Sequence, residues 1–83
     1  MSRDHGRVQP LRCLAPGESG RIVHITAGDA GRLRRLSMLG VVRGAIVHLQ
    51  QTRPAAVIRV AETTVALEPE IADQIHVCRT TGD

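Results

Sequence analysis

The sequence is most informative in what it lacks, because its 83 residues include no lysine, phenylalanine, tyrosine or tryptophan. Without lysine the chain has no P-loop, no Schiff-base chemistry and no lysine general base. Without aromatic side chains it lacks the stacking platforms that grip single-stranded nucleic acid and the interfacial belts of membrane proteins. These absences leave a small binding module, and not an enzyme, as the expected class.

Long apolar runs are missing as well. No segment approaches the roughly 20 apolar residues that span a bilayer. The first ten residues contain two arginines, an aspartate and a histidine where a signal peptide has an apolar stretch. We therefore expect a cytoplasmic protein that is not embedded in a membrane, whose two cysteines, Cys13 and Cys78, are thiols.

The positive charge is modest and dispersed. All eleven basic residues are arginines, the formal net charge is +3, and only Arg32, Arg34 and Arg35 form a cluster. Proteins that bind nucleic acids usually carry a basic stripe or patch much stronger than this. We expect no nucleic-acid partner, so an RNA-binding barrel is the weakest hypothesis for the function of this chain.

The apolar content is aliphatic, with 22 valine, isoleucine and leucine residues in a chain long enough for one domain. We expect this domain at residues 11–79, between flexible ends at residues 1–10 and 80–83. A domain of this size gains little net stability from its core alone. A homo-oligomer that buries further apolar surface is therefore an open alternative.

Runs of β-branched residues bounded by glycine and proline predict five short strands. These lie at residues 21–26, 45–51, 57–60, 64–68 and 74–79. Leu11 and Leu14 suggest a short extended entry, and Pro69 begins a helical turn that ends at Asp73. Closing the strands into a small barrel removes exposed sheet edges, so the predicted fold is mainly β.

One short α-helix is predicted from Ala30 to Leu39, with Asp29 as its N-cap and Gly40 as the left-handed residue beyond its end. Its three leucines, at positions 33, 36 and 39, recur at helical spacing and predict one buried face. Turns are predicted between these strands and the helix. They place positive φ at Gly17 and Gly44 and a two-residue hairpin at Glu62-Thr63.

The order of leucines and glycines resembles the FeoA family, whose relatives include the C-terminal domain of iron-dependent repressors. The resemblance runs from Leu11 to Val77. It departs from the family at Arg43, where proline is common, and at Glu62, where glycine is common. The matching residues are Leu11, Leu14, Gly17, Gly20, Ile22, Leu33, Arg35, Leu36, Leu39, Gly40, Gly44, Ile58, Val60, Val65, Ala66, Leu67, Ala72, Ile75 and Val77.

This resemblance implies an SH3-like β-barrel of about five strands with one short α-helix and a helical turn. It also implies a small accessory or regulatory protein of ferrous iron uptake, without enzymatic activity or a required cofactor. The implied partner is the cytosolic GTPase part of a FeoB-type membrane iron transporter.

The helix offers the best candidate surface for such a partner. Arginine is favoured at interfaces and binds carboxylates through two parallel hydrogen bonds. Met38 lies off the leucine stripe, where a flexible thioether adapts to a partner. We predict that Arg32, Leu33, Arg34, Arg35 and Met38 form the partner-binding face, and the alternative is an ordinary solvated helix face.

A metal site is the competing hypothesis. His76 and Cys78 are two residues apart on one predicted strand, so they share a face, and Cys13 joins them if the terminal strands pair. Such a set suits zinc, and iron less specifically. It would make the chain a stand-alone metal-responsive domain related to the iron-dependent repressors. Ordinary surface roles for these three residues are the alternative.

Overall fold

Short strands dominate the part of the chain that the computed structural model describes, residues 7–26 and 28–80. The expected flexible segments at residues 1–10 and 80–83 fall largely outside these ranges, but residues 8–10 and 80 lie in strands. The elements, in chain order, are β1 (Val8–Pro10), the 3-10 helix η1 (Leu11–Cys13), β2 (Ser19–Ile25), α1 (Ala30–Met38), β3 (Ile46–Gln51), β4 (Ala56–Val60), β5 (Thr63–Leu67), α2 (Pro69–Gln74) and β6 (Ile75–Thr80).

The strands form one curved antiparallel sheet in the order β1-β6-β2-β3-β4-β5. The predicted mainly β architecture is confirmed, with six strands in place of five. The predicted closure is wrong, because among the described strands β1 and β5 remain edges that do not pair with each other. Edge strands of three and five residues expose few unpaired backbone groups, so an open sheet carries little risk of edge-to-edge association.

The N-terminal leucines enter the fold on a 3-10 turn, and not on the extended segment predicted from the sequence. The Leu14 amide donates to the Leu11 carbonyl at 3.1 Å, and both leucines are buried. Residues three apart in a 3-10 helix lie on the same side, whereas in a strand they point to opposite faces. The turn therefore lets both side chains reach the core.

The β4–β5 hairpin turns at Ala61 and Glu62, one residue earlier than predicted. Val60 pairs with Thr63, so Thr63 already belongs to β5. Ala61 adopts a φ of +54°, in the region that favours glycine. The other turns follow the sequence prediction, since Gly17 and Gly44 have φ of +94° and +93°.

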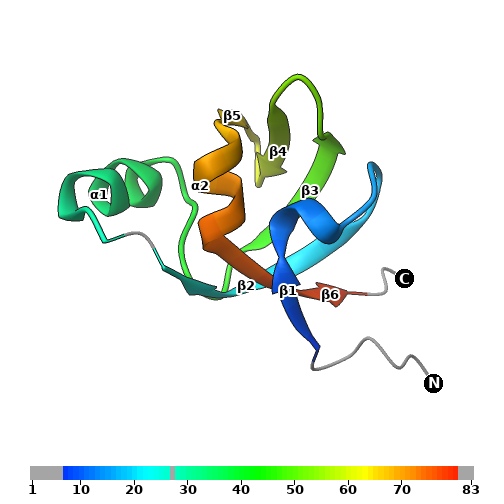
Figure 1. Cartoon of the computed structure of the whole chain (residues 1–83), viewed down its shortest axis with the longest axis horizontal. Helices are drawn as coiled ribbons and strands as arrows, with labels where there is room; N and C mark the ends of the chain where they lie inside the picture. The colour runs from blue at the N-terminus through cyan, green and yellow to red at the C-terminus, as the bar shows by residue number, and fades with distance from the viewer. Residues whose placement is uncertain (1–6, 27, 81–83) are drawn as a thin grey trace.

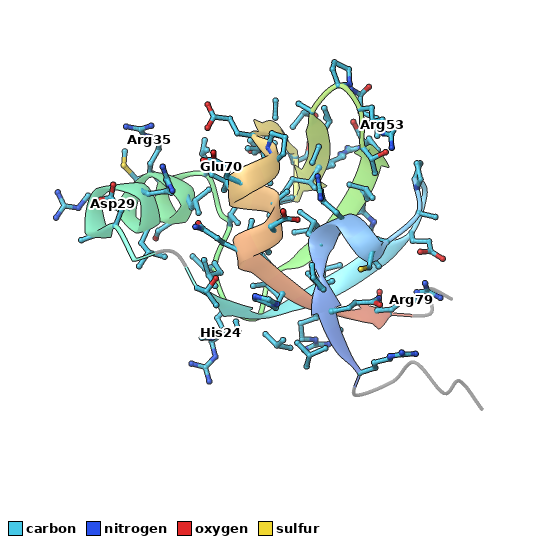
Figure 2. The ribbon with its side chains drawn as sticks, in the orientation of Figure 1. His24, Asp29, Arg35, Arg53, Glu70 and Arg79 are labelled. Carbon is cyan, nitrogen blue, oxygen red and sulfur yellow. The ribbon has the colours of Figure 1, made fainter. Side chains whose placement is uncertain are left out.

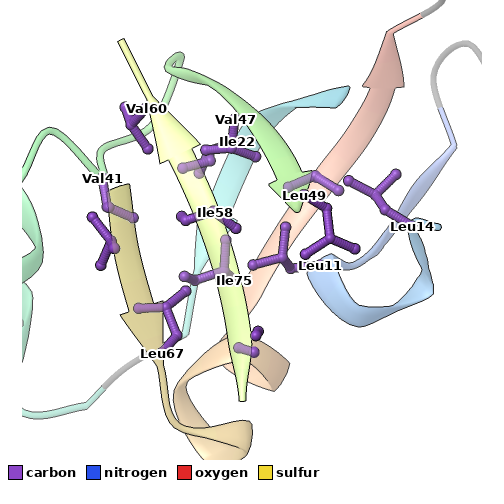
Figure 3. Close-up of a cluster of buried hydrophobic side chains, with 14 of the residues drawn as sticks. Leu11, Leu14, Ile22, Val41, Val47, Leu49, Ile58, Val60, Leu67 and Ile75 are labelled. Carbon is purple, nitrogen blue, oxygen red and sulfur yellow. The ribbon is translucent and has the colours of Figure 1, made fainter. Parts of the chain in front are cut away.

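The core lies on the concave side of the sheet and is entirely aliphatic (Figure 3). Side chains from every strand except β1 contribute to it, and η1, α1 and α2 each add at least one. Because burial of apolar surface contributes about 25 cal/mol per Å², this cluster is the main source of stability. Its members are Leu11, Leu14, Ile22, Leu36, Val41, Val47, Leu49, Ala56, Ile58, Val60, Val65, Leu67, Ala72, Ile75 and Val77.

The two α-helices occupy different places relative to the sheet (Figure 1). α2 lies against the body of the molecule, whereas α1 stands at one end, joined to the sheet by the segments that follow β2 and precede β3. None of the helices described here has the length and apolar content needed to cross a bilayer. The position of α1 leaves most of its surface accessible to a partner.

Candidate docking surface

Both ends of α1 are fixed by local hydrogen bonds. At the N-terminus an Asp29 carboxylate oxygen accepts from the amides of Gly31 at 2.8 Å and Arg32 at 3.4 Å, as the predicted N-cap requires. At the C-terminus the Val41 amide donates to the Leu36 carbonyl at 2.9 Å, and the Gly40 amide donates to the Ser37 carbonyl at 3.0 Å. Together with the φ of +90° at Gly40, these two bonds form a Schellman motif. The caps therefore define the helix ends although little of the helix is buried.

The leucine stripe of α1 is buried only at its centre. Leu36 is 4% exposed, whereas Leu33 and Leu39 are each 37% exposed, so the predicted continuous buried face is wrong at its two ends. The helix ends at Met38, and Leu39 is its C-cap. Because α1 stands at the end of the molecule, Leu36 reaches the core and the outer two leucines remain partly in water.

Other exposed apolar side chains lie beside these leucines. Met38 is 80% exposed and Val42 is 40% exposed. A groove of about 360 Å³ separates the start of α1 from the end of β2, and its walls include Ile25, Leu33 and Val42. Exposed apolar patches of this kind on small proteins often mark binding sites.

Four arginines border this apolar area. Arg34 and Arg35 are exposed, Arg32 is half-buried, and Arg43 lines the groove. Residues 30–43 contain no aspartate or glutamate. The ion pairs Arg12–Asp73 and Arg79–Glu18 lie elsewhere in the fold. The segment therefore combines positive charge with exposed apolar side chains.

The five predicted partner-binding residues lie on this segment, and four of them are accessible. Arg34 and Arg35 lie four and three positions before Met38, so each of them neighbours Met38 on the outer side of α1. Figure 2 shows Arg35 at the end of the molecule farthest from Arg53. Val42 was not among the predicted residues, and Leu39 was predicted to lie on the buried face of the helix. We define the α1 surface as Arg32, Leu33, Arg34, Arg35, Met38, Leu39, Val42 and Arg43.

The predicted metal ligands do not converge. Cys13 is exposed on η1, at a second groove of about 780 Å³ that also involves Arg53 and Pro69. His76 and Cys78 are half-buried on β6. Across the part of the chain that the structure describes, no three histidine, cysteine, aspartate or glutamate side chains gather closely enough to hold a metal ion. β6 instead pairs His76 with His24 of β2, a pairing that was not predicted from the sequence.

One protein-family model matches the sequence. The family is described as the FeoA domain, and its model aligns with residues 9–79, which is most of the chain. None of the curated proteins matches the sequence. The matched range includes all of the leucines and glycines, from Leu11 to Leu67, on which the resemblance is based.

Several solved structures share the fold. The crystal structure of an iron uptake regulatory protein, FeoA, is 26% identical with a TM-score of 0.77, and the alignment covers 88% of this chain and 97% of that one. The solution structure of FeoA from Chlorobium tepidum is 24% identical with a TM-score of 0.81, covering 90% and 73%. T. acidophilum IdeR is 19% identical with a TM-score of 0.82, covering 89% of this chain but 35% of that one. These likenesses confirm the SH3-like fold that the resemblance implied.

Proposed function

The chain belongs to the FeoA domain family, and from that premise we propose that it is a cytoplasmic accessory protein of ferrous iron uptake, not an enzyme. In this proposal the α1 surface docks on the cytosolic part of a FeoB-type iron transporter. The relatives with solved structures include an iron uptake regulatory protein and an iron(II) transport protein A from Clostridium thermocellum. These names support a role in iron transport, and the α1 surface supports docking as its mechanism.

The observation that carries the proposal is the composition of the α1 surface. Met38, at 80% exposure, is the most exposed of the large apolar side chains described, and it neighbours Arg34 and Arg35 on the outer side of the helix. Methionine and arginine are both enriched at protein interfaces relative to other surface. A solvated helix face would instead carry mixed charges, as surface helices usually do.

The charge of the α1 surface indicates the chemistry of its partner. Four arginines and no carboxylate over residues 30–43 favour an acidic counterpart, and the groove beside Leu33 favours an apolar side chain that fills it. A partner segment that carries aspartate or glutamate next to an apolar anchor meets both requirements. If only one nucleotide state of the transporter presents that segment, docking shifts the transporter toward that state.

Charge reversal at Arg34 and Arg35 tests the proposal. The double variant Arg34→Glu, Arg35→Glu should bind the purified cytosolic part of the transporter at least about tenfold more weakly, because it places like charges opposite the acidic segment. Binding of the unmodified chain should also weaken with added salt. Biolayer interferometry measures both effects.

Arg53→Glu is the matched control, since Arg53 is exposed on the loop between β3 and β4, away from α1 (Figure 2). It makes one charge reversal at a surface that the proposal leaves out, so its affinity should equal that of the unmodified chain. Circular dichroism checks that each variant is folded. Full binding by the double variant would refute docking through the α1 surface.

A further inference from the structure

β2 and β6 hold two histidine rings side by side on the face of the sheet away from the core. His24 pairs with His76 in the antiparallel register, and their ring centroids are 5.8 Å apart with the planes tilted by 33°. His24 is exposed and His76 is half-buried. The neighbours of His76 on β6, Ile75 and Val77, are both fully buried, so His76 points away from the core. Both imidazoles are thus accessible from the same side.

A β-bulge at Val23 is what brings His24 to this face. Ile22 pairs with Val77 and His24 pairs with His76, so the register shifts between residues 22 and 24. In a regular strand residues 22 and 24 point to the same face, and the buried Ile22 would place His24 toward the core. The inserted residue turns His24 to the opposite face. Bulges often change the direction of a side chain in this way at functional sites.

We propose that His24 and His76 chelate a divalent transition metal ion, with Zn²⁺ as the test ion. Imidazole nitrogen suits zinc, copper, nickel and iron. Zinc binds imidazole at about 2.0–2.1 Å, so two rings on one ion lie on the order of 5 Å apart between centroids. Small rotations of the two side chains bring the rings from the observed 5.8 Å to that spacing, without movement of the strands.

The site has two protein ligands and open coordination positions. Among the described side chains no third histidine, cysteine, aspartate or glutamate completes a cluster there, so water or a partner's side chain fills the remaining positions. Cys78 shares the face of His76, but it lies opposite Val8 and Arg21 and not opposite a second imidazole. The proposal is independent of docking, although His24 also lines the groove beside α1.

Titration of the full chain with Zn²⁺ alone tests the site. Isothermal titration calorimetry should give an affinity that falls at least about tenfold in His24→Ala and in His76→Ala, because a single imidazole loses the advantage of chelation. His48→Ala is the matched control, since His48 is an exposed β3 histidine whose ring is hydrogen-bonded to Ser19. Its affinity for zinc should not change.

Thermal unfolding gives a second readout. A ligand that binds only the folded state raises Tm, so zinc should raise Tm for the unmodified chain and for His48→Ala but not for His24→Ala. Because His24 is exposed, His24→Ala keeps the fold and decides the question even if His76→Ala does not fold. Zinc affinity that survives in His24→Ala, or that is lost only in Cys13→Ser, Cys78→Ser or His5→Ala, overturns the proposal.

Discussion

Gly20 on β2 lies so close to Val77 on β6 that a β-carbon added at Gly20 would stand 3.1 Å from the β-carbon of Val77. Such a contact is tighter than most β-carbon contacts in proteins, and Val77 is fully buried, so part of the core would have to shift to accommodate it. Gly20 is not among the glycines with positive φ. Packing between β2 and β6, and not backbone conformation, therefore requires glycine at this position.

Gly20→Ala should lower the free energy of unfolding by about 1–3 kcal/mol, the usual cost of overpacking a core. Urea denaturation measures the change. Gly28→Ala is the control, because a β-carbon at Gly28 would meet nothing within 4 Å and should change stability by no more than about 0.5 kcal/mol. Equal stabilities of the two variants would show that β2 and β6 separate easily.

The hairpin between β4 and β5 offers a stabilising substitution. Ala61 has a φ of +54°, a conformation that costs an L-residue about 1–2 kcal/mol and that glycine adopts freely. Ala61→Gly should therefore raise the free energy of unfolding by up to about 1 kcal/mol, since glycine's greater flexibility in the unfolded state offsets part of the gain. The midpoint of urea denaturation reports the change.

Ala66→Gly distinguishes this local effect from a general tolerance of glycine. Ala66 is exposed in the middle of β5 and pairs with Val57 in regular register. Glycine there should cost about 0.5–1 kcal/mol, because a strand interior gains nothing from positive φ. A loss of stability in Ala61→Gly would mean that the turn does not have the left-handed geometry described above.

Local patterns in the sequence were sufficient to predict most of the fold. β-branched runs and glycine-containing turns are properties of neighbouring residues, so β2 to β6 appear within two residues of their predicted bounds. β1 was missed because Val8, Gln9 and Pro10 have no strand pattern of their own. They are extended only because β6 pairs with them, and pairing between distant segments leaves no local signal.

The candidate sites, like the fold, could be predicted from the sequence only where residues close together in the chain determine the structure. Helical spacing indicated correctly that the leucines of α1 share a face, but it carries no information on whether another element covers that face. Leu33 and Leu39 are consequently more exposed than predicted. The pairing of His24 with His76 depends on a bulge at Val23, which alternation of residue types does not reveal.

The N-cap of α1 can be weakened without touching the core. Asp29→Ala removes the carboxylate that accepts from Gly31 and Arg32, and such substitutions cost about 1 kcal/mol. Because Leu36 is the only buried residue of α1, the loss should appear as faster amide hydrogen exchange across the helix. Asp29→Asn keeps an acceptor at the cap and should retain protection. Unchanged exchange in Asp29→Ala would show that packing alone holds the helix.

Met38 and Leu36 lie on the same helix, one exposed and one buried. Substitutions at the two positions therefore distinguish the effect of a surface contact on binding from the effect of core packing on stability. Met38 is 80% exposed, so Met38→Ala should change the free energy of unfolding by no more than about 0.5 kcal/mol. If Met38 anchors the transporter, the same variant should bind its cytosolic part about fivefold more weakly or worse, the usual loss for a buried interface contact. Thermal unfolding and biolayer interferometry measure the two quantities on one preparation.

Leu36→Ala should show the opposite profile. Leu36 is 4% exposed, and truncating a buried leucine costs about 2–5 kcal/mol. Stability should fall steeply, whereas the fraction that remains folded keeps Met38 and the arginines in place and should bind with nearly unchanged affinity.

If Met38→Ala binds normally while the double charge reversal at Arg34 and Arg35 does not, the interface is electrostatic and Met38 lies outside it. If both variants bind normally, the transporter uses a different face of the molecule.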